Sequence, residues 1–259
     1  MHDWRNEHKR VIIDFINYLN RSINNYILKG GTSLMLFYGL DRFSEDIDFD
    51  NVPGDRFHRT GERDIFKIVS NFCHEQGYEY RIAKDTQEVS RVFIHYELSG
   101  DLKKPLKVEV SYRKKVISEN QYQIIRGISV YNLDEICNMK VIAFSARDKI
   151  RDLYDLSYIV SEKYEYLPEK TIFLIQNALE YKGFDYFDYL VKTQNDKLID
   201  IDKFETRFLS MCNKIGLLGQ TRSRQQTEEK EAMKKEPDSL LKKSDERRSL
   251  LNRNDDFER

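Results

Sequence analysis

The stretch LKGGTSLMLFYGLDRFSEDIDFD, residues 28–50, decides the fold. A double glycine, Gly30 and Gly31, stands near its beginning, and acidic residues alternate with Ile47 and Phe49 near its end. Glycine lets the backbone bend sharply and approach another group closely. Alternation of apolar and acidic residues is typical of a strand with one buried and one polar face. The stretch therefore predicts a strand, a helix and a second strand, with charge gathered on one face.

Periodic patterns predict the other elements. Apolar residues at helical spacing predict helices at residues 8–19, 32–40 and 64–75. Alternating and β-branched runs predict strands at residues 26–29, 46–50, 78–83, 89–98, 106–111 and 122–129. From Leu133 onward the period is helical, so we place a boundary near Tyr131. The sequence thus predicts an α+β protein, with a mixed sheet flanked by helices in residues 1–131 and a helical bundle in residues 132–218.

Composition limits the class of protein. The charge-rich segment 219–259 has too few apolar residues for a core of its own, so we expect it to be disordered or to form solvated helices. The net charge of −1 predicts no general attraction to nucleic acid, and any such contact needs a local basic patch. The three cysteines lack paired spacing, which fits a reducing compartment. No signal peptide and no apolar run of the roughly 20 residues that cross a bilayer is present, so we expect a cytoplasmic protein without a membrane partner.

Three carboxylates are candidates for a metal site. Asp46 and Asp48 lie two residues apart on a predicted strand and therefore share a face, where they can converge on one or two divalent ions. Glu109, in the predicted strand LKVEVS, can supply a third carboxylate if the two strands are neighbours. Oxygen ligands without histidine or cysteine favour magnesium over zinc. The alternative is a solvent-facing strand with hydrated acids, and in either case Glu45 and Asp50 receive no role.

The double glycine stands where a strand passes into a helix, and Thr32 and Ser33 follow at once. Free N–H groups and the positive end of the helix dipole attract phosphate at such a position. A nucleoside triphosphate can then lie between this helix start and a metal ion held by the acids. The alternative is a tight turn before an edge strand.

Two stretches resemble one family, the AbiEii/AbiGii-type nucleotidyltransferase toxins, a branch of the polymerase-β-like nucleotidyltransferase superfamily. In the first stretch the matching residues are Gly30, Gly31, Thr32, Ser33, Leu34, Arg42, Ser44, Asp46, Ile47 and Asp48. The second, SVYNLDEICNMKVIAFSARDKIRDLYDLSYIV at residues 129–160, resembles the family's helical lysine and its Arg-Asp-Leu-Tyr-Asp-Leu segment. Here Lys140, Asp152 and Asp155 match, and whether Asp152 or Asp155 is the functional aspartate stays open. The resemblance covers about residues 26–160.

This resemblance implies a polymerase-β-like nucleotidyltransferase domain followed by a helical bundle. It implies a metal-dependent transfer of a nucleoside monophosphate from an NTP to an acceptor hydroxyl, by the toxin of a toxin–antitoxin or abortive-infection system. The implied catalytic residues are Asp46, Asp48, Glu109, Lys140 and Asp152, of which Asp46, Asp48 and Glu109 hold Mg²⁺ or Mn²⁺. The implied nucleotide-binding residues are Gly30, Gly31, Thr32, Ser33, Arg42, Ser44, Arg147 and Arg151.

The role of Arg147 and Arg151, the acceptor and the function itself each have an alternative. On an uninterrupted helix Lys140, Arg147 and Arg151 would share a face and meet the triphosphate, or they form a solvated helix laced by ion pairs. The resemblance implies a tRNA or other RNA end as acceptor, less often a protein side chain, and an antitoxin encoded by a neighbouring gene. Basic residues at 113–115 either steer RNA or form a plain charged turn. The rival functions are a catalytically silent nucleotide- or RNA-binding protein of the same fold, and a nuclease that uses the three acids.

Overall fold

The computed structural model describes residues 4–22, 25–51, 64–97, 104–114 and 116–218. Met1–Phe208 form one compact unit and Leu209–Arg259 a second, of which the described part is the end of a helix and the residues up to 218. The predicted boundary near Tyr131 falls inside the first unit, and the three-part division stays a prediction. The state predicted for residues 219–259 lies outside the described residues.

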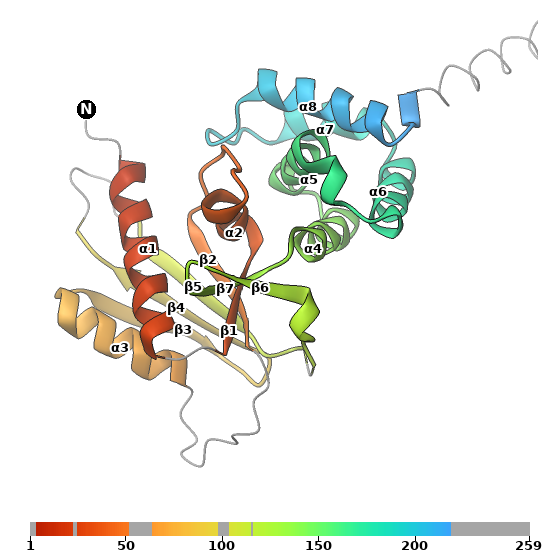
Figure 1. Ribbon diagram of the computed structural model, residues 1–259. Coiled ribbons are helices and arrows are strands. Elements are labelled where there is room, and N and C mark those ends of the chain that lie inside the picture. Colours follow the sequence, from red (N-terminus) through yellow and green to blue (C-terminus); the bar gives the residue numbers. More distant parts are fainter. Residues whose placement is uncertain (1–3, 23–24, 52–63, 98–103, 115, 219–259) are drawn as a thin grey trace, which may run out of the picture. The chain divides into compact units, whose positions relative to one another are not determined.

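Strands and helices follow the order expected for a sheet domain with helices after it (Figure 1). The strands are β1 (Tyr26–Lys29), β2 (Asp46–Asn51), β3 (Glu79–Asp85), β4 (Val89–His95), β5 (Leu106–Ser111), β6 (Tyr122–Ile125) and β7 (Ile128–Tyr131). The helices are α1 (Trp4–Ser22), α2 (Gly30–Phe37), α3 (Asp64–Gln76), α4 (Leu133–Ala146), α5 (Ile150–Lys163), α6 (Glu169–Lys182), α7 (Asp185–Thr193) and α8 (Ile201–Lys214). None of the helices in the described part of the chain is long and apolar enough to cross a bilayer.

The described strands form one mixed sheet in the order β3-β4-β5-β2-β1-β7-β6. At its centre β2 pairs antiparallel with β1 and parallel with β5. The register places Asp48 opposite Glu109 and Asp46 opposite Lys107. The neighbouring strands that the metal-site prediction required are therefore present.

One face of the sheet is buried beneath α1 and α3, which lie side by side on it (Figure 1). Phe15 of α1 and Phe72 of α3 meet edge to face, with ring centroids 5.2 Å apart. Ile47 and Phe49 of β2 point into the same core. Because side chains alternate along a strand, burial of these two residues leaves Asp46 and Asp48 on the opposite, polar face.

The predicted single strand at residues 122–129 is wrong, because the chain reverses within it. β6 and β7 form an antiparallel hairpin in which Ile125 pairs with Ile128. The two turn residues, Arg126 and Gly127, have φ values of +52° and +82°. Positive φ at both positions is the geometry of a type I′ turn, whose twist matches that of the paired strands.

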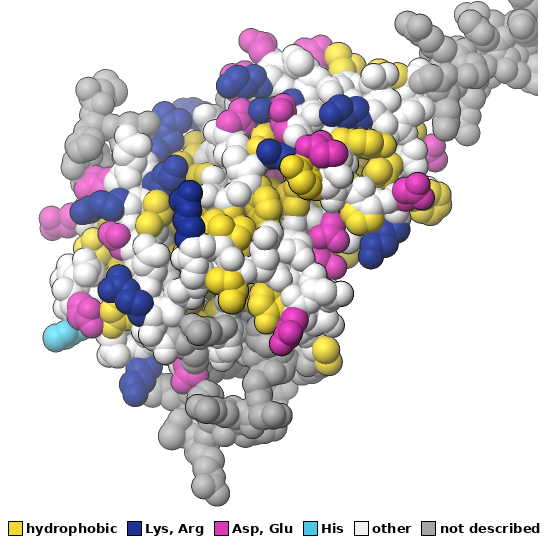
Figure 2. Space-filling model, in the orientation of Figure 1, with side chains coloured by type: hydrophobic (Ala, Val, Ile, Leu, Met, Phe, Trp, Pro, Cys, Tyr) yellow, Lys and Arg dark blue, Asp and Glu magenta, His cyan; other side chains and the backbone are white. Residues whose placement is uncertain are grey.

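Helices α4 to α7 pack against one another after the sheet, α4 with α5 and α6, and α5 with α7. Lys140, Arg147 and Arg151 do not lie on one uninterrupted helix, which was the condition for a shared face. α4 ends at Ala146, Arg147 has an extended backbone, and α5 begins at Ile150. On the face shown in Figure 2, hydrophobic side chains are frequent over these helices. The exposed hydrophobic residues of α4 and α6 include Ile142, Phe173 and Tyr181, each more than 60% exposed.

Candidate functional site

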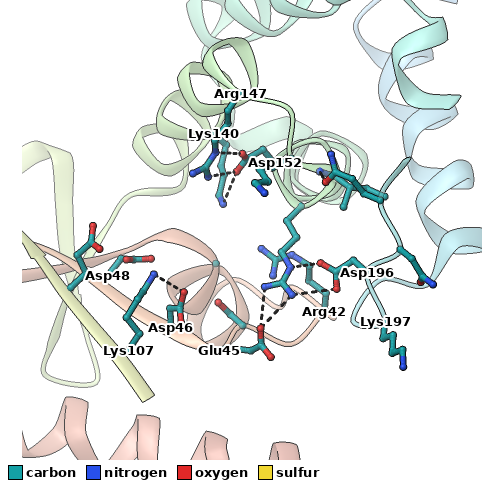
Figure 3. Close-up of a pocket in the computed structure, with 18 of the residues that line it drawn as sticks. Arg42, Glu45, Asp46, Asp48, Lys107, Lys140, Arg147, Asp152, Asp196 and Lys197 are labelled. Atoms are coloured by element: carbon teal, nitrogen blue, oxygen red, sulfur yellow. Dashed lines mark hydrogen bonds and ion pairs between the residues drawn. The ribbon is translucent and has the colours of Figure 1, made fainter. Parts of the chain in front are cut away.

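A cleft of ≈ 790 Å³ lies between the polar face of β2 and β5 and the start of α5 (Figure 3). The predicted residues that line it are Gly31, Arg42, Ser44, Asp46, Asp48, Glu109, Lys140, Arg147, Arg151 and Asp152. Gly30, Thr32 and Ser33 do not line it. Residues that the sequence analysis did not single out also line it, namely Glu45, Arg91, Lys107, Lys149, Ile150 and the segment 194–197.

The acidic side of the cleft is made by two adjacent strands. Asp46 forms an ion pair with Lys107 (2.6 Å), and Glu109 forms one with Arg91 (2.7 Å). Both pairs cross between neighbouring strands, as the register requires. The cations therefore partly neutralise a row of carboxylates that would otherwise repel one another.

Asp48 lies at the centre of this row. Burial raises the pKa of Asp48 above its usual value, and the nearby carboxylates of Asp46 and Glu109 raise it further, against the opposing charges of Lys107 and Lys29. Asp46 and Glu109 thus lie close enough to Asp48 for their charges to act on it. A divalent cation placed among them would relieve this repulsion.

The donor chemistry fits a hard cation. The three side chains offer only carboxylate oxygens, the ligands that Mg²⁺ and Mn²⁺ prefer. Within the described residues, no group of three or more His, Cys, Asp or Glu side chains is arranged to hold a metal ion. Two of the three carboxylates, those of Asp46 and Glu109, form ion pairs with Lys107 and Arg91.

The two glycines are required by side chains of the site. Gly30 has φ +77°, which favours glycine, and a Cβ there would lie 3.1 Å from Oδ2 of Asp48. A Cβ on Gly31 would lie 2.8 Å from both Nη2 of Arg42 and Oγ of Ser44. The start of α2 is thus packed directly beneath polar groups that line the cleft.

Thr32 and Ser33 are buried and bonded to the backbone. Thr32 Oγ1 donates to the carbonyl of Asp46 and lies 3.0 Å from Ser44 Oγ. Ser33 Oγ donates to the carbonyl of Gly30 at 2.7 Å. These hydroxyls hold the start of α2 against β2, and the contact to phosphate expected of them stays a prediction.

Arg42, Asp155 and Lys140 form a buried charged cluster beside the cleft. Arg42 donates from Nε and Nη2 to the two oxygens of Asp155, at 2.6 and 2.7 Å, and Lys140 Nζ lies 2.7 Å from Asp155 Oδ2. Burial by itself would raise the pKa of Asp155, but the charges of Arg42 and Lys140 outweigh it and hold this pKa below its usual range. Asp155 therefore stays ionised and positions both cations.

Asp152 differs from Asp155 because it faces the cleft. Its carboxylate accepts from Arg147 Nε at 2.7 Å and Nη2 at 3.1 Å, and it lies 3.5 Å from Lys140 Nζ. In Figure 3, Lys140, Arg147 and Asp152 lie together on one side of the cleft, and Asp46, Asp48 and Lys107 lie on the other. The geometry thus separates the two helical aspartates that the sequence left equivalent.

Glu45, set aside in the sequence analysis, is held at the wall of the cleft. Its carboxylate forms ion pairs with Lys104 and with Arg151, whose Nη1 is 3.3 Å from Oε2. Arg151 also pairs with Asp196, in the segment between α7 and α8. No motif marks Asp196, whereas Lys107 had a signal, since it shares a strand face with Glu109.

The two described residues of the basic segment 113–115 make other contacts. Arg113 forms an ion pair with Glu88 (3.1 Å). Lys114 lies 3.3 Å from the buried Asp50 and 4.2 Å from the ring centroid of Tyr131. Residue 115 lies outside the described residues. Neither of the two described side chains lines the cleft.

Comparison with known proteins places these features in a family. The model of the family described as "Nucleotidyl transferase AbiEii toxin, Type IV TA system" matches residues 19–244. The match extends beyond the motifs at residues 26–160 and includes the C-terminal helices. No curated protein matches the chain significantly.

Solved structures with a similar fold come from bacteria. JHP933 from Helicobacter pylori is 24% identical, with a TM-score of 0.66, over 88% of this chain and 99% of that chain. A putative nucleotidyltransferase from H. pylori is 24% identical, with a TM-score of 0.65, over 86% of this chain and 98% of that chain. MenT4, a nucleotidyltransferase toxin from Mycobacterium tuberculosis H37Rv, is 17% identical, with a TM-score of 0.46, over 80% and 82%. The first two likenesses confirm the predicted fold class, a mixed sheet flanked by helices with further helices after it.

Proposed function

Because the chain belongs to the AbiEii family of nucleotidyl transferase toxins of type IV toxin–antitoxin systems, we propose that its cleft transfers a nucleoside monophosphate from an NTP to a hydroxyl at an RNA end. The match to the family model confirms the predicted family, and with it the predicted enzyme class, a nucleotidyltransferase. It also implies an NTP as substrate and an antitoxin as partner. The metal ion, the acceptor and the roles of single residues are our proposal.

The observation that carries this proposal is the arrangement of charge across the cleft. Carboxylates of Asp46, Asp48 and Glu109 line one side, and Lys140 and Arg147 line the other. A triphosphate with its metal ion presents both signs of charge and needs both kinds of partner. A site for a neutral metabolite would need neither.

The acidic side would hold the metal ion. Asp46, Asp48 and Glu109 would bind Mg²⁺ or Mn²⁺, which supplies Lewis-acid stabilisation of charge on the phosphoryl oxygens when bound. The raised pKa of Asp48, caused by burial and by the neighbouring acids, supports this assignment. Lys107 and Arg91 keep the acids in place and carry positive charge at the same wall.

The remaining residues bind and orient the substrates. Lys140 and Arg147 neutralise the β- and γ-phosphates, and Asp152 orients both cations. The acceptor oxygen attacks the α-phosphorus, the bond from this phosphorus to the β-phosphate oxygen breaks, and pyrophosphate leaves. Glu109 accepts the proton of the acceptor hydroxyl. Arg42 acts indirectly, because its guanidinium is bonded to Asp155 and supports the floor of the cleft.

Label transfer tests the proposal. The full chain is incubated with each α-³²P-labelled NTP, Mg²⁺ or Mn²⁺, and total RNA, and the RNA is resolved on a denaturing gel. We expect label in RNA that depends on metal and is lost in Asp48→Asn, whereas Asp14→Asn, an exposed aspartate on α1, keeps wild-type transfer. Nucleotide binding without transfer would instead support the silent binding protein. Shortening of RNA without added NTP would support the nuclease.

A further inference from the structure

A second hollow of ≈ 400 Å³ lies beside the cleft. It shares Glu45, Arg151, Asp196 and Lys197 with the cleft, so the two spaces have a common wall. Its other lining residues are Trp4, Arg5, Lys104 and Leu198. These residues come from the start of α1, the segment before β5 and the segment before α8. None of these segments belongs to the family motifs at residues 28–50 and 129–160.

Positive charge prevails in this second hollow. Four cations, those of Arg5, Lys104, Arg151 and Lys197, stand against two carboxylates, those of Glu45 and Asp196. Both carboxylates are already paired, Glu45 with Lys104 and Arg151, and Asp196 with Arg151. Lys197 is exposed, and none of the carboxylates in the described ranges forms an ion pair with it. The hollow thus favours an anion, although the whole chain carries a net charge of −1.

Trp4 adds an aromatic surface to these charges. Its indole is half-buried and is fixed by edge contacts with Phe43 and His8, at centroid distances of 5.4 and 5.7 Å. The ammonium of Lys104 lies 5.2 Å from the indole centroid. An aromatic ring amid cations is the pattern by which proteins bind single-stranded nucleic acid, with a base stacked on the ring and phosphates on the cations.

We propose that the second hollow binds the acceptor strand, with a terminal base of single-stranded RNA stacked on Trp4 and a backbone phosphate bound by Lys104 and Lys197. This inference rests on the proposed function. Glu45 and Arg151, which line both spaces, then lie between the RNA in the hollow and the NTP in the cleft. The terminal hydroxyl of the RNA reaches the edge of the cleft. A hydroxyl on a protein side chain would not need the indole or the cations, so RNA is the acceptor that this surface fits.

Trp4 is the chain's single tryptophan, so its fluorescence reports on this hollow directly. The full chain is titrated with an eight-nucleotide single-stranded RNA that carries a 3′ hydroxyl, with and without a non-hydrolysable NTP analogue. We expect quenching by the RNA, with or without the analogue, because a stacked base quenches the indole. The analogue by itself leaves the fluorescence unchanged, because it occupies the neighbouring cleft.

Variants test the same contacts without relying on fluorescence. The anisotropy of a labelled RNA measures affinity, and Trp4→Ala should weaken it about tenfold, whereas Trp4→Phe should retain most of it. Lys104→Ala should lower the slope of log affinity against log salt by about 0.7, the value for one lost phosphate contact on a single strand. Lys67→Ala, an exposed lysine on α3, is the matched control and keeps the wild-type slope.

The outcomes separate this inference from the proposed function. If Trp4→Ala labels RNA with a wild-type KM for RNA, the proposed RNA subsite is wrong. The same holds if RNA binds the wild-type chain without quenching its fluorescence. Neither result contradicts the proposed transferase function. Labelling of protein in place of RNA would overturn both. Binding of the labelled NTP analogue by Trp4→Ala and Lys104→Ala at wild-type affinity shows that the cleft itself is undisturbed.

Discussion

Arg42 and Asp155 form a buried bidentate ion pair, with Nε–Oδ1 and Nη2–Oδ2 distances of 2.6 and 2.7 Å. The arginine precedes β2, and the aspartate lies on α5. The pair therefore joins the polar side of the sheet to the helix that forms the opposite wall of the cleft. Lys140 of α4 binds the same carboxylate and completes the connection.

Asp155→Asn should strongly destabilise the protein. The change removes the charged partner of the buried Arg42 and leaves Lys140 only its 3.5 Å contact with Asp152, which costs about 3 to 5 kcal/mol of the free energy of unfolding. Urea denaturation measures this loss. Asp200→Asn is the matched control, because Asp200 is exposed. Asparagine keeps an oxygen to accept from the Lys203 backbone N–H (3.2 Å), so the change removes the 3.9 Å ion pair with Lys203 and should cost less than about 1 kcal/mol. Equal losses in the two variants would contradict the role of the buried cluster.

The site should depend on glycine at position 30 for a reason beyond backbone strain. Gly30→Ala and Gly77→Ala both place alanine at a positive φ, +77° and +70°, and each should lose about 1 to 2 kcal/mol of stability. At Gly77 the new Cβ meets nothing within 4 Å, whereas at Gly30 it lies 3.1 Å from Oδ2 of Asp48. Gly30→Ala should therefore also lose nucleotide transfer. Wild-type transfer by a folded Gly30→Ala protein would argue against a precise position for Asp48.

His8 should make stability depend on pH. It is buried, it contacts the carbonyl of Glu45 through Nε2 at 2.8 Å, and the hydroxyl of Tyr96 donates to Nδ1. Burial lowers the pKa of His8 below its usual value of 6.5, against the raising effect of Glu45. The unfolded chain then binds the proton more readily, so stability is complete above pH 6.5 and falls as the pH drops toward the folded-state pKa.

The measurement for His8 is the free energy of unfolding between about pH 5 and pH 8. His8→Gln removes the titrating group, and its stability should fall less steeply below pH 6.5 than that of the wild type. His95→Gln, at an exposed position on β4, should keep the wild-type slope. If His8→Gln retains the full pH dependence of the free energy of unfolding, another group causes it.

Growth arrest should require the acids and the lysine of the cleft. Expression of Asp46→Ala, Asp48→Ala or Lys140→Ala should permit growth, because each change lowers transfer by at least about 100-fold, the usual effect of removing a group that stabilises transition-state charge. In vitro, EDTA should abolish transfer and added Mg²⁺ should restore it. Asp14→Asn should arrest growth like the wild type. Arrest of equal strength by all variants would contradict a catalytic toxin.

Several local features could be predicted because they depend on neighbours in the chain. The alternation of Ile47 and Phe49 with acids predicted a strand and its polar face, and the structure places β2 there. The strand at residues 26–29 was also predicted correctly, and the helix predicted at residues 32–40 is α2, which begins at Gly30 and ends at Phe37. The hairpin at Arg126 was missed, because a turn within a β-rich run is marked only by the glycine that follows. About half of the residues that line the cleft were among the predicted site residues.

The contacts between distant segments could not be predicted in this way. Glu109 had a plausible strand face, but only the parallel register brings it beside Asp48. Asp155 and Asp152 looked equivalent on one helix, but Arg42 binds the first, whereas the second, although buried, lines the cleft. Trp4, Lys104 and Asp196 carry no shared pattern, yet they meet around one hollow.

The sequence by itself therefore determined the strands and helices near the glycines, the polar face of β2 and the family of the chain. Each of these depends on the spacing of residues that are close to one another in the sequence. Only the tertiary structure decided which cations hold which carboxylates, which side chains would crowd a Cβ at Gly31, and where a second hollow opens beside the first. The physical reason is that ion pairs and close packing depend on the distance between side chains, which the topology of the sheet and helices sets.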